Sequence, residues 1–258
     1  MRAVWLIART VLIEAVRRRE IYAIVMISVL LIGAVMTVDF FGLRGLTKFY
    51  AEVALKVMGL STAVTAIVLA ARQLPREFEA RTIYPLLAKP VGRGRFIAGK
   101  VLGVMLASAF CLSLFLSVYV AGTGYLGGRL AWGLLAQYAW LQMVGCLVLV
   151  TLSLWLSLVV NLDAAITFAL VFMATSSVVS GAVSYLYDFA GGFGQAVLVA
   201  ATYGLPQMGL FDLSEKTVHA EAWAPLDLGT MAAVTAYGAF FSALYAGAAW
   251  WCFRRRAL

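Results

Sequence analysis

Residues Leu130–Leu162 read LAWGLLAQYAWLQMVGCLVLVTLSLWLSLVVNL and contain no Asp, Glu, Lys or Arg. A helix needs about 20 apolar residues to cross the hydrocarbon core of a bilayer. The stretch therefore predicts a membrane-spanning helix with residues to spare. We interpret the surplus, residues 130–136 with Trp132, as a segment that first runs along the membrane interface. Asp163 follows the stretch and indicates a tight turn into the next one.

The same pattern recurs along the chain. Six further stretches lack Asp, Glu, Lys and Arg, namely residues 21–38, 57–71, 101–128, 164–187, 189–211 and 228–253. The stretch 57–71 is short, but residues 53–55 extend it past Lys56, whose long side chain can reach the interface. All of these stretches except 189–211 are predicted to span the membrane.

Residues 189–211 decide whether the chain has six spans or seven. Five of them are glycines and one is Pro206, which makes a straight helix unfavourable. We interpret this stretch as a re-entrant or interfacial element on the outer side, before the last span. Irregular backbone is tolerated at that depth where protein covers it or where it lines a cavity. The prediction is therefore six spans.

The composition agrees with a membrane protein. Of the 258 residues, 64% are apolar and 12% are charged, whereas soluble domains are about half apolar and a quarter charged. No segment has the composition of a separate soluble domain. The sequence predicts one all-α polytopic membrane domain over residues 1–258, with six transmembrane helices.

The distribution of charge gives the orientation. Fifteen of the 20 Lys and Arg residues fall at the two ends of the chain and in residues 72–100, which join the second and third spans. With these parts in the cytoplasm, the inside carries a net charge of +10 and the outside −2, as the positive-inside rule expects. A seven-span layout would place Arg254–Arg256 outside. We therefore expect both termini to be cytoplasmic, and we interpret the net charge of +8 as loop charge rather than as a nucleic-acid site.

Both ends of the chain carry further signs of a membrane surface. Residues 2–19 have helical periodicity, with charged residues opposite an apolar face made of Val4, Ala8, Val11, Leu12 and Ala15. This pattern predicts an interfacial helix on the cytoplasmic surface. Trp250 and Trp251 lie at the inner boundary of the last span, as in an aromatic belt.

Groups that could carry chemistry are few. Residues 94–100 match the start of the phosphate-binding pattern GxxxxGK[ST], but Val101 stands where the magnesium-binding hydroxyl is needed. We interpret Gly99 and Gly103 as a GxxxG face for close helix packing instead. His219, the only histidine, lies among scattered carboxylates, which are typical of a solvated loop. The sequence predicts no catalytic, cofactor or metal site, and the apolar spans indicate that driving energy arrives from elsewhere.

The charged segment 72–100 reads RQLPREFEARTIYPLLAKPVGRGRFIAGK. Pro75 suits the first turn of a helix, and Pro85 tends to end it. Glu77 lies near the positive end of that helix and four residues before Arg81, a favourable pair. These features predict a short, charged cytoplasmic helix between spans 2 and 3, and an ordinary basic loop is the alternative. Its apolar contacts would be Phe78 and Ile83.

This segment resembles the hallmark of permeases, the membrane subunits, of ABC-2-type ABC transporters. Their pattern, close to E…E…GT…LLA/S-KP-v-sR…f…GK, joins the second and third spans. The matching residues are Glu77, Glu79, Thr82, Leu86, Leu87, Lys89, Pro90, Arg93, Phe96, Gly99 and Lys100. Ala80 and Arg81 depart from it, since many members have glycine before the threonine. The segment is closest in style to the permease branch of copper-enzyme maturation transporters, and the layout of the whole chain is also similar.

The resemblance implies a permease of an ATP-driven exporter in the bacterial inner membrane. It implies a homodimer in which each copy binds a separate ABC ATPase subunit, and that subunit holds ATP and Mg²⁺. This chain would bind no cofactor itself. The short cytoplasmic helix would be the coupling helix, and its ATPase-contacting residues would be Glu77, Phe78, Glu79, Arg81, Thr82 and Ile83.

Two alternatives from other classes stay open at this stage. One is a membrane scaffold or assembly factor without ATP coupling, and the other is an intramembrane enzyme. The motif carries no information about the substrate, whether a lipid, a peptide, a drug, or sulfur or copper cargo.

Overall fold

The computed structural model describes residues 2–17, 19–36, 42–79 and 92–255. The regular elements in these ranges are all helical. They are α1 (Arg2–Val16), α2 (Arg19–Met36), α3 (Gly42–Glu79), α5 (Arg93–Tyr125), α6 (Trp132–Val159), α7 (Leu162–Leu186), η1 (Tyr187–Phe189), α8 (Gly192–Gly204), η2 (Met208–Phe211), α9 (Ser214–Val218) and α10 (Leu228–Arg255).

Four helices in the described ranges are long and apolar enough to cross a bilayer. They comprise residues Thr47–Phe78, Arg93–Tyr125, Trp132–Val159 and Leu228–Arg255. Shorter apolar helices comprise residues Val25–Ala34 and Leu162–Ser176. The prediction of an all-helical membrane protein is confirmed at this level, and the layout of six spans stays a prediction.

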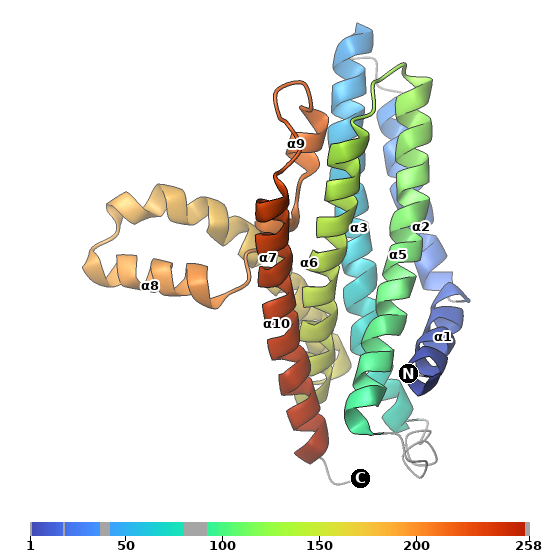
Figure 1. The fold of residues 1–258 in the computed structure, drawn as a ribbon, viewed down its shortest axis with the longest axis vertical. Coiled ribbons are helices and arrows are strands. Elements are labelled where there is room, and N and C mark those ends of the chain that lie inside the picture. The colour runs from blue at the N-terminus through green and yellow to red at the C-terminus, as the bar shows by residue number, and fades with distance from the viewer. Residues whose placement is uncertain (1, 18, 37–41, 80–91, 256–258) are drawn as a thin grey trace.

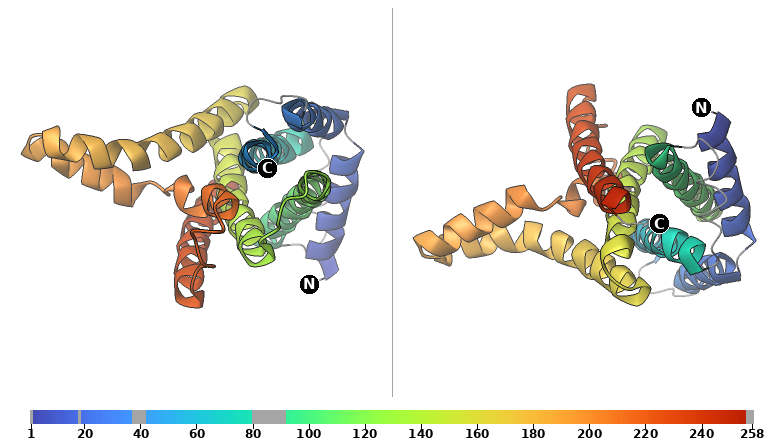
Figure 2. Two further views of the ribbon diagram at one scale, coloured as in Figure 1. Left: turned by 90° about the horizontal axis from the view of Figure 1, so that it is seen from above. Right: turned by 90° about the horizontal axis from the view of Figure 1, so that it is seen from below.

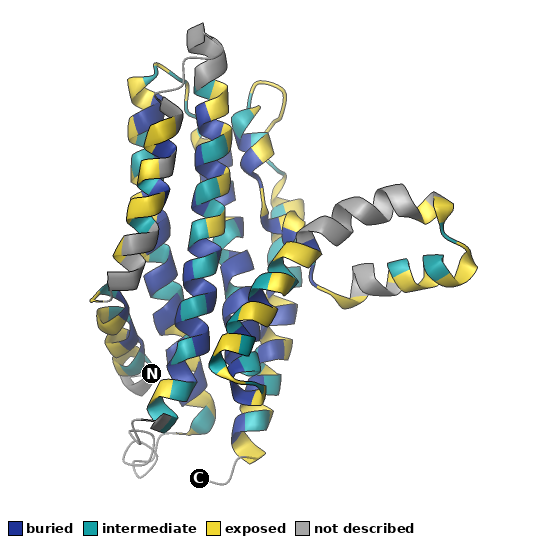
Figure 3. Ribbon diagram, turned by 180° about the vertical axis from the view of Figure 1, so that it is seen from behind, coloured by how far each residue is buried: buried dark blue, intermediate teal, exposed yellow. Residues whose placement is uncertain are grey.

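The long helices form an elongated bundle (Figure 1). α6 packs against α3 and α10, while α5 packs against α3 and α1. Figure 2 shows α10 inclined to the other long helices, with α1 along the flank of α5. Figure 3 shows buried residues on the inward faces of the bundle and exposed residues on its outside. Many of the exposed residues are large and apolar. An apolar exterior of this kind suits hydrocarbon as the surrounding medium.

Side-chain hydrogen bonds tie α6 to α3 within the apolar core. The hydroxyl of Tyr138 donates to the carbonyl oxygen of Leu55 at 2.8 Å, and Nε2 of Gln142 donates to that of Gly59 at 2.8 Å. Polar groups in hydrocarbon need such partners, because water is not there to replace them. The two bonds lie one helical turn apart and therefore fix the register between the two helices.

Two local predictions were wrong. Residues 132–136 do not form a separate interfacial segment, because α6 begins at Trp132 and continues to Val159. The amide of Leu135 donates to the carbonyl oxygen of Ala131 at 2.9 Å, and Leu134 and Leu135 are buried. The backbone of the first turn is thus hydrogen-bonded within the helix, and its side chains pack against the bundle. A bilayer requires such hydrogen bonds, because it offers no water to replace them.

The second correction concerns Pro75, which lies inside α3 rather than in the first turn of a new helix. Proline cannot donate the helical hydrogen bond to the carbonyl of Ala71. The packing of its neighbours offsets that loss, since Leu74 is fully buried and Phe78 packs against the main core. α3 therefore continues past Pro75 as far as Glu79.

Residues 187–204 leave the bundle, and η2 returns to it with Met208 and Phe211 buried. The end of α7 and the whole of α8 form a hairpin that projects sideways (Figures 1 and 2). α8 has 13 residues and is about 20 Å long at 1.5 Å per residue, shorter than the roughly 30 Å core of a bilayer. By itself α8 is too short to span, and the placement of this element at the outer membrane surface stays a prediction.

Candidate functional site

One end of the bundle gathers most of the charged motif. It is the lower end in Figure 1, where α3 ends at Glu79, α5 begins at Arg93 and α10 ends at Arg255. We call residues 72–79, 93–100 and 250–255 the basic end. Seven of its residues are Lys or Arg and two are Glu. The segment 80–91, which joins α3 to α5 in the sequence, lies outside the described residues.

A buried lysine lies at the centre of the basic end. Lys100 of α5 is 4% exposed. Its ammonium forms an ion pair with Oε1 of Glu77 and donates a hydrogen bond to Oε1 of Gln73 at 3.0 Å. Gln73 and Glu77 are one turn apart on α3, so both present their oxygens to the same ammonium. The ammonium also lies 5.7 Å from the ring centroid of Phe96.

Aromatic contacts join α10 to the same place. Phe253 is fully buried. Its ring centroid lies 5.9 Å from that of Phe96 on α5 and 6.3 Å from that of Phe78 on α3. Arg93 places its guanidinium 6.0 Å from the Phe253 ring and donates to the carbonyl oxygen of Arg254 at 2.7 Å. The ends of three helices that are distant in the sequence thus share one contact cluster.

The rim of the basic end has the character of a membrane interface. The guanidinium of Arg254 lies 5.5 Å from the Trp250 ring, and that of Arg255 lies 4.6 Å from the Trp251 ring. Arg with Trp at the end of a spanning helix is a frequent combination at the headgroup level. The rim therefore offers cations to solvent or lipid, whereas Lys100 is enclosed.

α1 is held against the start of α5 by two glycines. A Cβ on Gly99 would lie 2.9 Å from Cβ of Ile7, and one on Gly103 would lie 2.5 Å from Cβ of Val11. The face of α1 that meets them includes the buried residues Ala8 and Val11. The two helix backbones therefore approach each other at these glycines, where a larger residue would hold them apart.

The opposite end of the bundle is covered by α9 and the turn after it, while η2 packs deeper, with Phe211 against Gly145 near the middle of α6. Lys56 of α3 pairs with Asp212 at 2.7 Å, and Lys48 pairs with Glu221 at 3.0 Å. Burial raises the pKa of Asp212, but hydrogen bonds from Lys56 and Ser214 outweigh it, so that this pKa lies below its ordinary value. These pairs attach the covering segment to α3.

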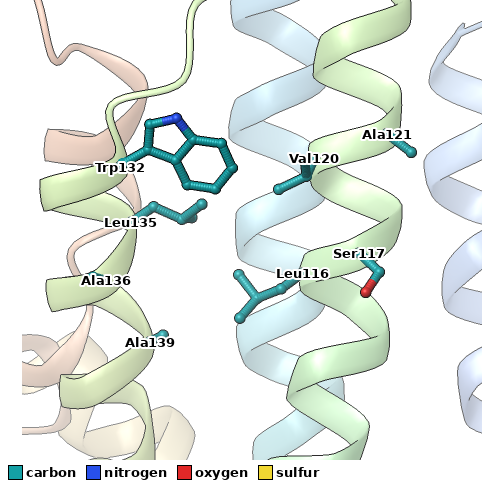
Figure 4. A pocket seen from close by; sticks show the side chains of 8 residues that line it. All are labelled: Leu116, Ser117, Val120, Ala121, Trp132, Leu135, Ala136 and Ala139. Atoms are coloured by element: carbon teal, nitrogen blue, oxygen red, sulfur yellow. The ribbon is translucent and has the colours of Figure 1, made fainter.

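A groove of about 560 Å³ between α5 and α6 lies near that opposite end (Figure 4). Its lining is Leu116, Ser117, Val120, Ala121, Trp132, Leu135, Ala136 and Ala139. The only hydroxyl in it, on Ser117, donates to the carbonyl oxygen of Ser113 at 2.9 Å. The groove therefore presents an apolar surface.

The residues predicted to contact an ATPase lie at the basic end or just beyond it. Glu77 and Phe78 are near the end of α3 and contact α5 and α10. Glu79 is the last residue of α3. The others, Arg81, Thr82 and Ile83, fall in the segment 80–91, outside the described residues.

The sequence paired Glu77 with Arg81, which lies outside the described residues, and did not identify the partners that the structure gives to Glu77 and Phe78. Lys100 matched the motif without a role, and Gln73 and Phe253 were not singled out. The sequence does contain a signal for the contact between Glu77 and Lys100, because Gln73 and Glu77 share a helix face and Lys100 follows Phe96 by one turn. The contact with Phe253 joins residues too distant in the sequence for helical periodicity to reveal it.

None of the curated proteins matches this chain. A family model described as ABC-2 family transporter protein matches residues 5–192, which run from α1 to the start of α8 and include the first two ranges of the basic end. The match confirms the resemblance inferred from residues 72–100, while the copper-maturation branch stays a prediction. The chain belongs to the ABC-2 family of transporter proteins.

Proposed function

We propose that this chain is the membrane-spanning permease subunit of an ABC transporter that exports its substrate with energy from a separate ATPase. The family match over residues 5–192 carries this proposal. A permease of this kind catalyses no reaction itself, and ATP and Mg²⁺ would be bound by the ATPase. Two copies of the chain would pair to enclose the path of the substrate.

The basic end is the surface that we assign to the ATPase. The positive-inside rule favours the cytoplasm for this end, because seven of its residues are Lys or Arg. Its helix ends flank the segment 80–91, which contains the rest of the family-like motif. Glu77, Phe78, Glu79, Arg81, Thr82 and Ile83 would form the coupling contact.

The arrangement in the membrane follows from this orientation. Six spans would place both termini and residues 80–91 in the cytoplasm of a bacterial cell. α1 would lie at the inner surface, and its outward residues Trp5 and Leu6, which are 57% and 60% exposed, would enter the lipid interface. The covering segment with α9 would lie outside.

Purification of the tagged protein from membranes in mild detergents tests the proposal. The expected result is a stoichiometric ABC ATPase, identified by mass spectrometry, with ATP hydrolysis in the purified fraction. Ile83→Glu should release the ATPase while the permease still inserts, because it places a charge in the proposed contact. The matched control is Phe193→Glu, at an 86% exposed residue of α8, which should retain the ATPase. A wild-type preparation without any ATPase would favour a membrane scaffold instead.

A further inference from the structure

Lys100, Gln73 and Glu77, which we call the Lys100 cluster, join the end of α3 to the start of α5. The acceptors, Gln73 and Glu77, are in the last two turns of α3, and Lys100 is in the second turn of α5. The two helices are joined in the sequence by residues 80–91 alone. The cluster therefore holds together the two helix ends that flank this segment in the sequence.

The cluster is built for an ion pair rather than for apolar packing. The side chain of Lys100 is 5% exposed and that of Glu77 is 19% exposed. An ammonium so enclosed requires a partner, since an unpaired buried charge is strongly unfavourable. Oε2 of Glu77 is buried and has no hydrogen-bond partner in the part of the chain that the structure describes. The bond to Lys100 is therefore the contact that keeps this carboxylate inside.

The start of α5 is held by three helices. Lys100 ties it to α3, and its neighbour Gly99 lies against Ile7 of α1. One turn earlier, Phe96 stacks on Phe253 of α10. A movement of the end of α3 can thus reach α5 through the ion pair, and then α1 and α10 through packed side chains.

We propose that the Glu77–Lys100 ion pair transmits movement of the end of α3 to α5, which makes Lys100 a positioning residue for ATP coupling. This proposal rests on the proposed function and adds the internal contact through which that function would operate. Glu77 belongs to the proposed coupling contact and would join that contact to Lys100 inside the permease.

The test uses the purified complex of permease and ATPase with spin labels at two exposed residues. Arg76→Cys on α3 and Arg95→Cys on α5 carry the labels. Cys252, which is only partly buried, is replaced by alanine so that it is not labelled, whereas Cys111 and Cys146 can stay because both are buried. The distance between labels is measured with and without a non-hydrolysable ATP analogue and Mg²⁺. The affinity of the ATPase for the permease is measured under the same two conditions.

Lys100→Met should leave the ATPase bound but remove the change in distance that the ATP analogue produces. The factor by which the analogue changes ATPase affinity should fall about fivefold or more, as for the loss of a coupling between two sites. The exchange Glu77→Lys with Lys100→Glu should restore both readouts. Lys56→Met, which removes an exposed cation at the opposite end, is the matched control and should change neither.

A double variant, Glu77→Met with Lys100→Met, keeps the test decisive if Lys100→Met does not fold. Replacing a buried ion pair by apolar residues of similar volume is often neutral for stability. Normal coupling in this double variant or in Lys100→Met would overturn the inference while leaving the proposed function intact. Absence of an ATPase from the wild-type complex would overturn both.

Discussion

Gly103 of α5 and Val11 of α1 are so close that a Cβ on the glycine would lie 2.5 Å from Cβ of the valine. It would also lie 2.9 Å from the carbonyl oxygen of Ala8, which is backbone and cannot move aside by itself. The contact places α1 directly against the bundle. The amphipathic helix is therefore packed on protein along one face, in addition to any contact with lipid.

Gly103→Ala should for this reason destabilise the protein by about 1–3 kcal/mol, the usual cost of overpacking a close contact. Alanine favours a helix over glycine by about 1 kcal/mol, so a net loss can come only from the contact. The measurement is the thermal unfolding temperature in detergent. Gly124→Ala, on the same helix with open space around it, is the control and should be neutral or slightly stabilising. Equal effects at the two positions would contradict a tight contact between α1 and α5.

Phe253→Ala should destabilise the protein by about 3–5 kcal/mol, because it removes a fully buried ring and leaves a cavity. The ring holds the ends of α3, α5 and α10 together, so we expect those ends to become accessible before the rest of the bundle unfolds. Hydrogen exchange at residues 72–79 and 93–100 measures this directly. Phe193→Ala, at an exposed position, should leave exchange at both ranges unchanged. Slow exchange there in Phe253→Ala would show that α10 is dispensable for this end.

Tyr138→Phe should cost about 0.5–1.5 kcal/mol, the net contribution of one hydrogen bond. The variant keeps the ring in its buried place and removes only the donor to the carbonyl of Leu55. Unfolding in detergent gives the difference from the wild type. Tyr125→Phe is the control, since Tyr125 is 85% exposed and should not affect stability. A neutral Tyr138→Phe would mean that the Leu55 carbonyl needs only its helical partner.

The sequence was most informative where one residue type governs the structure. Stretches without charge located α5, α6 and α10, because hydrocarbon excludes charged side chains over the whole length of a span. It was misleading at Trp132 and Pro75, where packing extends helices beyond the point at which local propensity would end them. The Lys100 cluster illustrates a third case. Its residues can be read from the sequence, but the contact between them depends on how α3 and α5 pack.

Asp212 gives the protein a predictable dependence on acid. Its pKa in the folded protein lies below the ordinary 3.8 because Lys56 and Ser214 bind the charged carboxylate, despite some burial. A carboxyl group of this kind stabilises the fold above its unfolded pKa, and the stabilisation is lost as pH falls through the folded value. Asp212→Asn should therefore unfold at a lower temperature than the wild type, by a constant margin from about pH 7 to about pH 5.

Below about pH 4 that margin should shrink, because Asp212 of the wild type becomes protonated and loses the same interaction. Thermal unfolding across this pH range measures the margin. Glu221→Gln is the control, because the Glu221 side chain is 83% exposed and solvent screens its pairing with Lys48. A margin that widens in acid would contradict a lowered pKa for Asp212.

The two proposed sides of the membrane can be told apart by labelling single cysteines with an impermeant reagent. Arg95 lies at the basic end, and Ala222 lies in the exposed turn after α9 at the opposite end. Six spans predict that Ala222→Cys reacts in intact spheroplasts and that Arg95→Cys reacts only after the membrane is opened. Cys252→Ala provides the background, since Cys252 is only partly buried.

If the hairpin of α7 and α8 instead completed an additional crossing, residues after it would exchange sides while Arg95 would not. Ala222→Cys would then react only in opened membranes and Arg255→Cys would react in intact ones, so this pair of variants separates six spans from seven whatever the ATPase does.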